Sequence, residues 1–322
     1  MIFNSTIIKS KGITIPEWTI ATTANIKPSL IAYGDGMFVA IGQSTRFGTA
    51  TYIAGYSTDG VTWTTATLPV TAEWTHLVYG NGMFVAVDSE TNLKLVYSTD
   101  RGATWNQGTY LSSFRTGLFG YGGGKFIMGG TSSNNTYSST DCITWTDGGG
   151  PSIIMNRLAY GNGMFVGMYY NRETEFGYSY DGKSWETGTM PEFGCQSIAY
   201  GGGMFLAIGR ENGAEALYSA DGITWNETSI PISLSQGGQG GHAGPNGGIS
   251  FKQIAYGSGK FVTLGYNSDK VIYSFDGITL LAHKVPDTGS GSNADKWNSI
   301  AYGNGRFVAV QGTTNVIYGQ EA

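Results

Sequence analysis

One phrase occurs seven times along the chain and constrains the fold more than any other feature. Its copies span 31–41, 77–87, 121–129, 158–168, 198–208, 254–264 and 300–310, and two of them read IAYGDGMFVAI and LAYGNGMFVGM. Each copy places a short glycine turn between two apolar stretches, which is the pattern of a β-hairpin. Repeats of this kind indicate a fold built from equal structural units.

A second phrase follows each of the first six copies and reads YSTDGVTW in its first occurrence, at 56–63. Its first five aspartates are separated by 41, 41, 40 and 40 residues. An aspartate can accept backbone N–H groups within its own turn, and the following glycine supplies a positive φ. We therefore predict a structural role for the six aspartates of these turns, Asp59, Asp100, Asp141, Asp181, Asp221 and Asp276.

Each repeat contains four predicted strands. The first precedes the glycine turn, the second follows it, the third ends at YS, and the fourth begins at TW. A period near 40 residues with this content is typical of the blades of a β-propeller. The 51 glycines, 20 tyrosines and 15 phenylalanines agree with tight turns and aromatic strands. We predict an all-β chain in which residues 1–322 form a single seven-bladed β-propeller with four-stranded blades.

The last repeat ends after its third strand, so one strand must come from elsewhere. The sequence WTIATT at 18–23 resembles WTTATL at 63–68, the outer strand of the first complete repeat. We therefore expect residues around 13–21, within a closing segment 1–24, to complete the last blade. Such an exchange would close the ring and leave no open sheet edge.

The pattern S-x-D-G-x-T-W resembles the Asp-box (BNR) repeat of sialidases and of many non-enzymatic propellers. Together with IAYGNGxFVAV, it is similar to the repeats of bacteriophage tail-fibre and receptor-binding propellers and of related bacterial surface proteins. Three residues depart from the pattern: Arg101 is inserted, Cys142 replaces a glycine, and Leu280 replaces a tryptophan. Because the matching residues belong to turns and core, the resemblance implies the fold more strongly than the function.

The propeller topology predicts where a ligand binds. The inner glycine turns and the aspartate turns are expected on one rim, the repeated rim. The links between second and third strands and between blades form the other, the varied rim, and loops on a rigid scaffold often carry function. Tyrosine and arginine dominate binding hot spots, and aromatic faces stack on sugars. The candidate ligand-binding residues on the varied rim are Arg46, Phe47, Tyr169, Tyr170, Arg172, Arg210 and Tyr266.

Two further features belong to this organisation. The glycine-rich stretch 232–250 is expected to be a loop insertion, and its composition fits either an arm that orders on a partner or a linker. Four aromatic residues that precede inner strands are predicted to lie in the core, namely Trp74, Phe114, Phe251 and Trp297.

Catalysis is not expected. A sialidase-like reaction needs three converging arginines, a tyrosine activated by a glutamate, and an acid/base carboxylate. The chain has no Arg-Ile-Pro motif, and its repeated tyrosines are expected to be structural. Asp88 and Glu90 share a loop that we expect to be a solvated tip. The three histidines, His76, His242 and His283, lack a metal-ligand spacing, so we predict no catalytic residue, metal or cofactor.

The formal net charge of −5 gives no electrostatic footprint for nucleic acid or an anionic membrane. Cys142 and Cys195 are expected to be free thiols. No signal peptide or membrane-spanning segment is recognised, so we expect a soluble chain made in a host cytoplasm.

We predict a non-enzymatic virion protein of a phage tail that binds a host-surface carbohydrate or receptor through the varied rim. Other virion or tail proteins are the expected partners, with several copies in the assembly. The alternative is a structural virion or surface component that docks onto neighbouring proteins, and a more distant one is a sialidase-like glycoside hydrolase.

Overall fold

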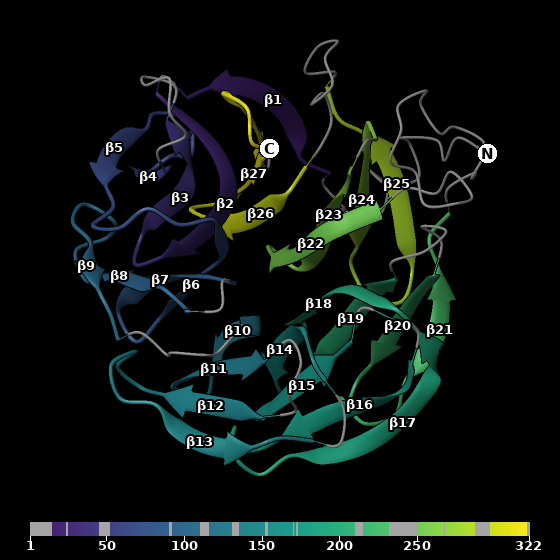
Figure 1. The fold of residues 1–322 in the computed structure, drawn as a ribbon. Coiled ribbons are helices and arrows are strands. Elements are labelled where there is room, and N and C mark those ends of the chain that lie inside the picture. The colour runs from purple at the N-terminus through teal and green to yellow at the C-terminus, as the bar shows by residue number, and fades with distance from the viewer. Residues whose placement is uncertain are drawn as a thin grey trace.

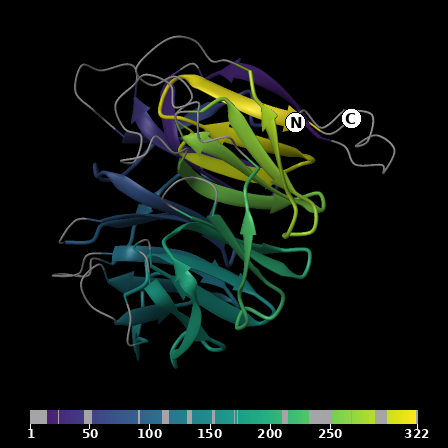
Figure 2. The same cartoon turned by 90° about the vertical axis from the view of Figure 1, so that its right-hand side faces the viewer.

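The computed structural model describes residues 15–23, 25–44, 52–89, 92–109, 116–130, 135–151, 154–169, 171, 173–209, 215–231, 250–266, 268–286 and 297–320. Within these ranges the strands form seven four-stranded antiparallel sheets arranged as a ring (Figure 1). Each sheet is one blade, and its strands run between the two faces of the ring (Figure 2). The predicted seven-bladed β-propeller is therefore confirmed.

The first four blades each use four strands that are consecutive in the sequence. Blade 1 comprises β2 (Ile26–Gly34), β3 (Met37–Ser44), β4 (Tyr52–Ser57) and β5 (Thr64–Thr67). Blade 2 comprises β6 (Trp74–Gly80), β7 (Met83–Asp88), β8 (Leu95–Ser98) and β9 (Asn106–Gln107). Blade 3 comprises β10 (Thr116–Gly122), β11 (Lys125–Gly130), β12 (Thr136–Ser139) and β13 (Thr146–Gly149). Blade 4 comprises β14 (Arg157–Gly161), β15 (Met164–Met168), β16 (Glu173–Ser179) and β17 (Glu186–Phe193).

The remaining three blades complete the ring. Blade 5 comprises β18 (Cys195–Gly201), β19 (Met204–Gly209), β20 (Glu215–Ser219) and β21 (Asn226–Ser229). Blade 6 comprises β22 (Ser250–Gly257), β23 (Lys260–Tyr266), β24 (Lys270–Ser274) and β25 (Leu280–Lys284). Blade 7 comprises β26 (Ser299–Gly303), β27 (Arg306–Val310), β28 (Asn315–Gln320) and β1 (Glu17–Thr22).

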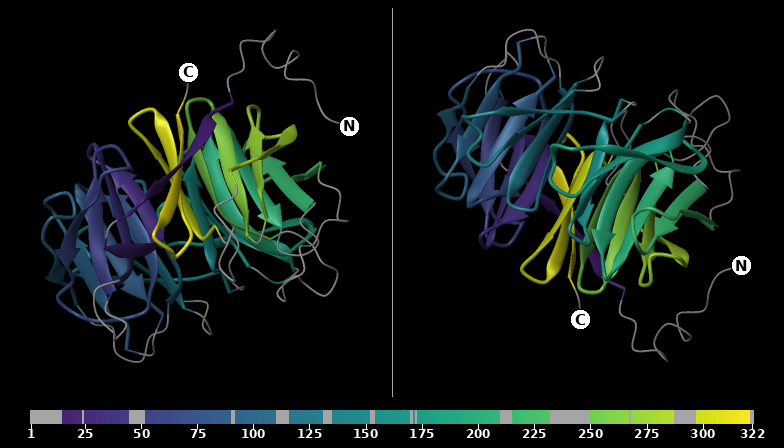
Figure 3. Two further views of the ribbon diagram at one scale, coloured as in Figure 1. Left: turned by 90° about the horizontal axis from the view of Figure 1, so that it is seen from above. Right: turned by 90° about the horizontal axis from the view of Figure 1, so that it is seen from below.

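The N-terminal strand closes the ring, as predicted. β1 pairs antiparallel with β28, in a register that runs from Glu17 opposite Gln320 to Thr22 opposite Asn315. The purple β1 lies beside the yellow strands of blade 7 in Figures 1 and 3. Blade 7 therefore also has a tryptophan in its outer strand, Trp18 of β1. This side chain donates its Nε1–H to the Tyr273 hydroxyl in blade 6.

The inner glycine turns have the backbone conformation that the sequence predicts. In the first one, Asp35 has a φ of 47° and Gly36 a φ of 76°. Positive φ at both central residues is the type I′ geometry of two-residue hairpins, which asparagine, aspartate and glycine tolerate best. The need for positive φ at both central residues therefore explains why the inner turns of the seven repeats have such similar sequences.

The repeated tyrosines form a ring that joins each blade to the next at the repeated rim. A Cβ atom placed on Gly34 would lie 2.0 Å from Cγ of Tyr79, so this strand end must be glycine. The same contact recurs at all seven boundaries between blades, with Tyr79 over Gly34, Tyr121 over Gly80, Tyr160 over Gly122, Tyr200 over Gly161, Tyr256 over Gly201, Tyr302 over Gly257 and Tyr33 over Gly303.

The aspartate turns are held by hydrogen bonds within each turn. In the first, Oδ1 of Asp59 accepts the backbone N–H groups of Val61 and Thr62 at 2.8 and 2.7 Å. Ser57 donates its hydroxyl to the same oxygen at 2.8 Å. Partial burial is the largest single influence and raises the pKa of the Asp59 carboxyl, but the hydrogen bonds together outweigh it, so the pKa lies below its ordinary value. The six turn aspartates therefore have structural contacts of the kind that the sequence predicts.

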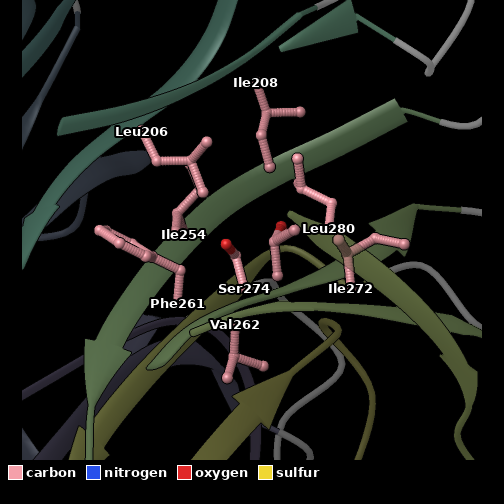
Figure 4. A pocket seen from close by; sticks show the side chains of 9 residues that line it. Leu206, Ile208, Ile254, Phe261, Val262, Ile272, Ser274 and Leu280 are labelled. Carbon is pink, nitrogen blue, oxygen red and sulfur yellow. The ribbon is translucent and has the colours of Figure 1, made fainter. Parts of the chain in front are cut away.

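The three departures from the repeat are accommodated in different ways. Cys142 adopts the left-handed conformation of the glycine it replaces, with a φ of 59°, and is fully buried. Leu280 packs with Ile272 against Leu206 and Ile208 of blade 5, with no water-sized space between the side chains (Figure 4). Arg101 reaches across to blade 1, where its Nε–H donates to Asp35.

The predicted core residues Trp74, Phe251 and Trp297 are buried, whereas Phe114 lies outside the described residues. The expectation that Asp88 lies at a solvated loop tip is wrong, because this side chain is fully buried. Its Oδ1 accepts the backbone N–H of Lys94 at 2.9 Å, and its Oδ2 lies 3.9 Å from the Lys94 ammonium. The carboxylate thus holds a loop together, while Glu90 lies outside the described residues.

Candidate functional site

The starts of the inner strands surround a cavity of about 350 Å³. It lies at the end of the central channel opposite the ring of tyrosines, and therefore on the varied rim. We call this cavity the channel mouth. Every blade contributes to its lining, with Leu30 from blade 1, His76 from blade 2, Phe119 from blade 3, Arg157 from blade 4, Gln196 from blade 5, Lys252 from blade 6 and Asn298 from blade 7.

Buried serines fix the inner strands around the mouth. The Ser299 hydroxyl in blade 7 accepts the backbone N–H of Ile31 in blade 1 at 3.0 Å. It also lies 2.6 Å from Oε1 of Gln253 in blade 6 and donates to that oxygen. Ser197 in blade 5 accepts the backbone N–H of Ile254 in blade 6 at 3.0 Å. Because these bonds cross blade boundaries, the wall of the cavity is a rigid part of the ring.

Two basic side chains line the mouth. They are Arg157 and Lys252, and the part of the lining that the structure describes includes no aspartate or glutamate. The Arg157 guanidinium is held by two backbone carbonyls, with Nε 2.5 Å from the oxygen of Gln196 and Nη1 2.8 Å from that of Asn156. The Lys252 ammonium lies 4.9 Å from the centre of the Tyr266 ring. These contacts position both basic side chains at the mouth.

His76 lies half-buried in the wall of the mouth. Its Nδ1 is 3.0 Å from the Thr75 hydroxyl, and its ring meets Phe119 edge to face at 6.4 Å. Burial, and secondarily the charge of Arg157, lowers the pKa of His76 from 6.5 to about 4. The imidazole is therefore neutral at neutral pH and serves as a hydrogen-bonding group.

Two amide side chains offer hydrogen-bonding atoms to a ligand. Oδ1 of Asn156 is buried and has no hydrogen-bond partner. Gln253 accepts with its Oε1 from Ser299 and from the backbone N–H of Ile300. Since buried polar atoms normally find partners, the Asn156 oxygen is available to accept a hydrogen bond from a ligand or from water.

The structure describes two of the seven residues predicted to bind a ligand. Tyr266 ends β23 and lies against Lys252 at the mouth. Tyr169 follows β15, is half-buried, and accepts the Cys195 N–H at 2.9 Å with its carbonyl oxygen. The other five lie outside the described residues, namely Arg46, Phe47, Tyr170, Arg172 and Arg210. Neither Tyr169 nor Tyr266 belongs to the described lining of the mouth itself.

Sequence analysis missed His76, Arg157, Gln196 and Lys252 because each occurs once and none forms a motif. The signal was positional. These residues stand one or two positions before the apolar phrase of their repeats, where the side chains of inner strands face the channel. Aligning the repeats and asking where they differ at a fixed position would have identified them.

Neither a protein-family model nor a curated protein sequence matches this chain. The fold is similar to that of virginiamycin B lyase from Staphylococcus aureus, with a TM-score of 0.73 at 12% identity, covering 94% of this chain and 99% of that one. It is also similar to YCF48 from Cyanidioschyzon merolae, with a TM-score of 0.64 at 13% identity, covering 94% and 99%. A third similar structure is the β-propeller domain of Swd1 from Myceliophteria thermophila, with a TM-score of 0.65 at 8% identity, covering 93% and 99%. At these identities the likeness shows the propeller fold alone.

Within the described ranges no helix has the length and hydropathy expected of a membrane span. In the same ranges no three His, Cys, Asp or Glu side chains are grouped so that they could hold a metal ion.

Proposed function

We propose that this chain is a non-enzymatic recognition propeller that binds a host-surface glycan or receptor at the channel mouth and the surrounding varied rim. The observation that carries this proposal is the cavity lined by all seven blades on the rim where the sequence varies. Concave sites of roughly 300–1,000 Å³ with a few convergent polar groups are typical ligand sites. The channel mouth has this size and this character.

The chemistry of the lining favours binding over hydrolysis. Amides, hydroxyls and two cations make hydrogen bonds and ion pairs to a polar ligand. Glycoside hydrolysis normally uses two carboxylates at a fixed separation. The described lining supplies no such pair.

The attachment role rests on sequence resemblance. The two repeated phrases are similar to those of phage tail-fibre and receptor-binding propellers, so we place the chain in a virion tail or a comparable attachment device. Several copies in one assembly follow from the same proposal, because weak sugar sites gain their strength from multivalency.

The test is binding of the full chain to a glycan array and to intact bacterial cells. Lys252→Ala, at an exposed position of the mouth, should weaken binding at least about tenfold, since it removes a charged contact. Lys183→Ala, exposed in an aspartate turn of the repeated rim, is the matched control and should bind as the unaltered chain does. Equal binding by all three proteins would contradict the proposed site.

Mass spectrometry of each bound glycan distinguishes binding from catalysis. We expect every glycan to be recovered unchanged after prolonged incubation. A shortened or eliminated product would instead place the chain among enzymes, as for the lyase whose fold it shares.

One observation favours a second candidate, a structural component that docks onto a neighbouring protein. Apolar side chains are exposed in the aspartate turns of four consecutive blades, at Ile143, Tyr180, Ile223 and Ile278. Single exposed apolar residues are ordinary, but the same turn in adjacent blades forms an arc on the repeated rim. If Ile143→Ser with Ile223→Ser abolished co-purification with a virion subunit while cells and glycans remained unbound, this candidate would replace the first.

A further inference from the structure

We infer that a second pocket, on the outer wall of the ring between blades 6 and 7, binds a neutral saccharide. It lies between β25 and β1, the outermost strands of these blades (Figure 1), and we call it the seam pocket. Its volume is about 430 Å³, and its lining includes Pro16, Glu17 and Trp18 from the closing segment and Tyr273, His283 and Pro286 from blade 6. The described linings of this pocket and of the channel mouth share no residue, so the inference goes beyond the proposed function.

At other boundaries between blades, the aspartate turn of one blade covers the outer strand of the blade before it. Thr228 of blade 5 donates its hydroxyl to the Ile278 carbonyl, in the turn of blade 6, at 2.8 Å. A Cβ atom placed on Gly148 of blade 3 would lie 2.9 Å from Cα of Lys183, in the turn of blade 4. The turn and the strand beneath it are therefore in direct contact.

Blade 7 lacks such a turn, because its third and fourth strands, β28 and β1, come from opposite ends of the described chain. In blade 1, the Trp63 indole N–H donates to the Gly60 carbonyl of its own turn at 3.1 Å. Trp18, the equivalent tryptophan of blade 7, donates instead to the Tyr273 hydroxyl of blade 6. The seam pocket thus borders the part of the outer strand that a turn covers at the other boundaries.

His283 is the one large side chain at its position of the repeat. The position lies three residues after the tryptophan of the outer strand, or after Leu280 in blade 6, and elsewhere holds Ala21, Ala66, Gly108, Gly148, Gly188 and Thr228. The His283 side chain is exposed, and its ring meets the buried Tyr273 ring edge to face at 6.4 Å. A side chain of this size crowds a turn placed as that of Lys183 lies over Gly148, so a ligand of another shape fits better.

The lining combines apolar surface with hydrogen-bonding groups of both kinds. Trp18 and Pro286 are half-buried and offer apolar contact to the C–H face of a sugar ring. The Glu17 carboxylate accepts hydrogen bonds, and the His283 imidazole both donates and accepts them. Burial raises the pKa of Tyr273, so its hydroxyl keeps its proton and can donate while it accepts from Trp18. Sugar hydroxyls, which also donate and accept, match this set.

The charges at the pocket favour a neutral ligand. Glu17 is the one acid and Lys284 the one lysine or arginine in the described lining. The Lys284 ammonium also lies 3.1 Å from Oδ2 of Asp269. A ligand of either sign would therefore meet a like charge, whereas a neutral saccharide would not. The volume lies within the roughly 300–1,000 Å³ that is usual for small-molecule sites.

The experiment is calorimetric titration of the full chain with neutral oligosaccharides of glucose, galactose, mannose and N-acetylglucosamine. We expect at least one to bind, with an affinity that changes little between low and high salt. His283→Ala and Glu17→Gln should each weaken this binding about tenfold or more, because each removes hydrogen bonds to the sugar. Alanine is the residue of the repeat at this position, so His283→Ala should keep the melting temperature of the unaltered chain.

Two control variants separate the seam pocket from other surfaces. Glu227→Gln, exposed on the outer strand of blade 5, and Lys252→Ala, at the channel mouth, should bind the same oligosaccharide as the unaltered chain does. If glycans bound only in a manner sensitive to Lys252→Ala, the inference would be overturned and the proposed function would stand. If binding depended on His283 alone, the inference would stand and the channel mouth would lose its support.

Two further outcomes would overturn the inference. Binding that appears only after deletion of residues 1–14, which keeps β1, would show that the chain itself fills the pocket. Binding of the peptide YSTDGVTW, the sequence of the first aspartate turn, in place of any saccharide and weakened by His283→Ala, would assign the pocket to a peptide turn.

Discussion

Nε of Arg101 in blade 2 donates to Oδ2 of Asp35 in blade 1 at 2.6 Å. In three other blades asparagine occupies the position of Asp35, and its Nδ2 donates to the carbonyl that precedes the turn aspartate of the adjacent blade. Asn81 does so to Thr140 at 2.9 Å, and Asn304 to Thr58 at 2.8 Å. Aspartate has no N–H to donate, so the inserted arginine reverses the direction of the bond. Asp35 and Arg101 thus depart from the repeat together, and their ion pair replaces the asparagine hydrogen bond at this boundary between blades.

This relationship predicts coupling between the two residues. Arg101→Ala and Asp35→Ala should each lower the unfolding free energy slightly. The double variant should lose no more unfolding free energy than the less stable of the two single variants, because either substitution already removes the ion pair. Because both side chains are exposed, the losses should shrink at about 1 M salt. Denaturant unfolding of the four proteins at low and high salt measures this, and additive losses would argue against coupling.

The ring of tyrosines predicts an asymmetry between neighbouring glycines. Gly34→Ala should cost roughly 3 kcal/mol, because its methyl group would overlap the Tyr79 ring and force the blades apart. Gly36→Asn should cost less than about 1 kcal/mol, since this turn position has open space and asparagine tolerates the left-handed conformation. Thermal and chemical unfolding compare the two, and equal losses would show that the tyrosine contact is dispensable.

His76 predicts a loss of stability in mild acid. Its pKa is lowered from 6.5 to about 4 in the folded chain, so the unfolded state binds a proton more readily. The stabilising contribution is present above pH 6.5 and is lost as the pH falls toward 4. When the pH is lowered from about 7 to about 5, the unfolding free energy of the His76→Gln variant should therefore fall by roughly 2 kcal/mol less than that of the unaltered chain. His283→Gln, at an exposed position, is the control and should behave as the unaltered chain does.

The aspartate turns predict a second loss in stronger acid. Backbone N–H groups of Lys183 and Ser184 lower the pKa of Asp181 from 3.8 to about 2. The carboxylate therefore stabilises the fold above pH 3.8, and this contribution disappears as the pH falls toward 2. Asp181→Ala should lower the unfolding free energy by about 1 kcal/mol at neutral pH, as loss of a side-chain cap does. The unfolding free energy of this variant should also depend less on pH between 3.8 and 2. Glu175→Gln, on an exposed strand position, is the control and should keep the pH dependence of the unaltered chain in acid titrations followed by circular dichroism.

Ring closure predicts that the first strand is essential. Deleting residues 1–22 removes β1 and uncovers β28, whose Val316 and Ile317 are fully buried. We expect the melting temperature to fall by roughly 10 °C or more, or cooperative unfolding to be lost. Deleting only residues 1–14 keeps β1 and is the matched control. A melting temperature unchanged by the longer deletion would contradict closure by β1.

The sequence by itself determined the number of blades, the positions of the turns, the closing strand, and the structural roles of the repeated tyrosines and aspartates. These features depend on local backbone chemistry, such as the positive φ of Gly36 or the N–H groups around Asp59, and repetition made them visible. It also predicted which rim is variable, because strand order places the two kinds of connection on opposite faces.

Only the tertiary structure decided what lies at the centre of that rim. His76, Arg157 and Lys252 are separated by 81 and 95 residues, yet they line one cavity because the ring brings seven strand starts together. The burial of Asp88 is a similar case, since its partner Lys94 meets it through a folded loop. Convergence of unrepeated side chains on a common axis depends on the closed ring, and no local pattern in the chain encodes it.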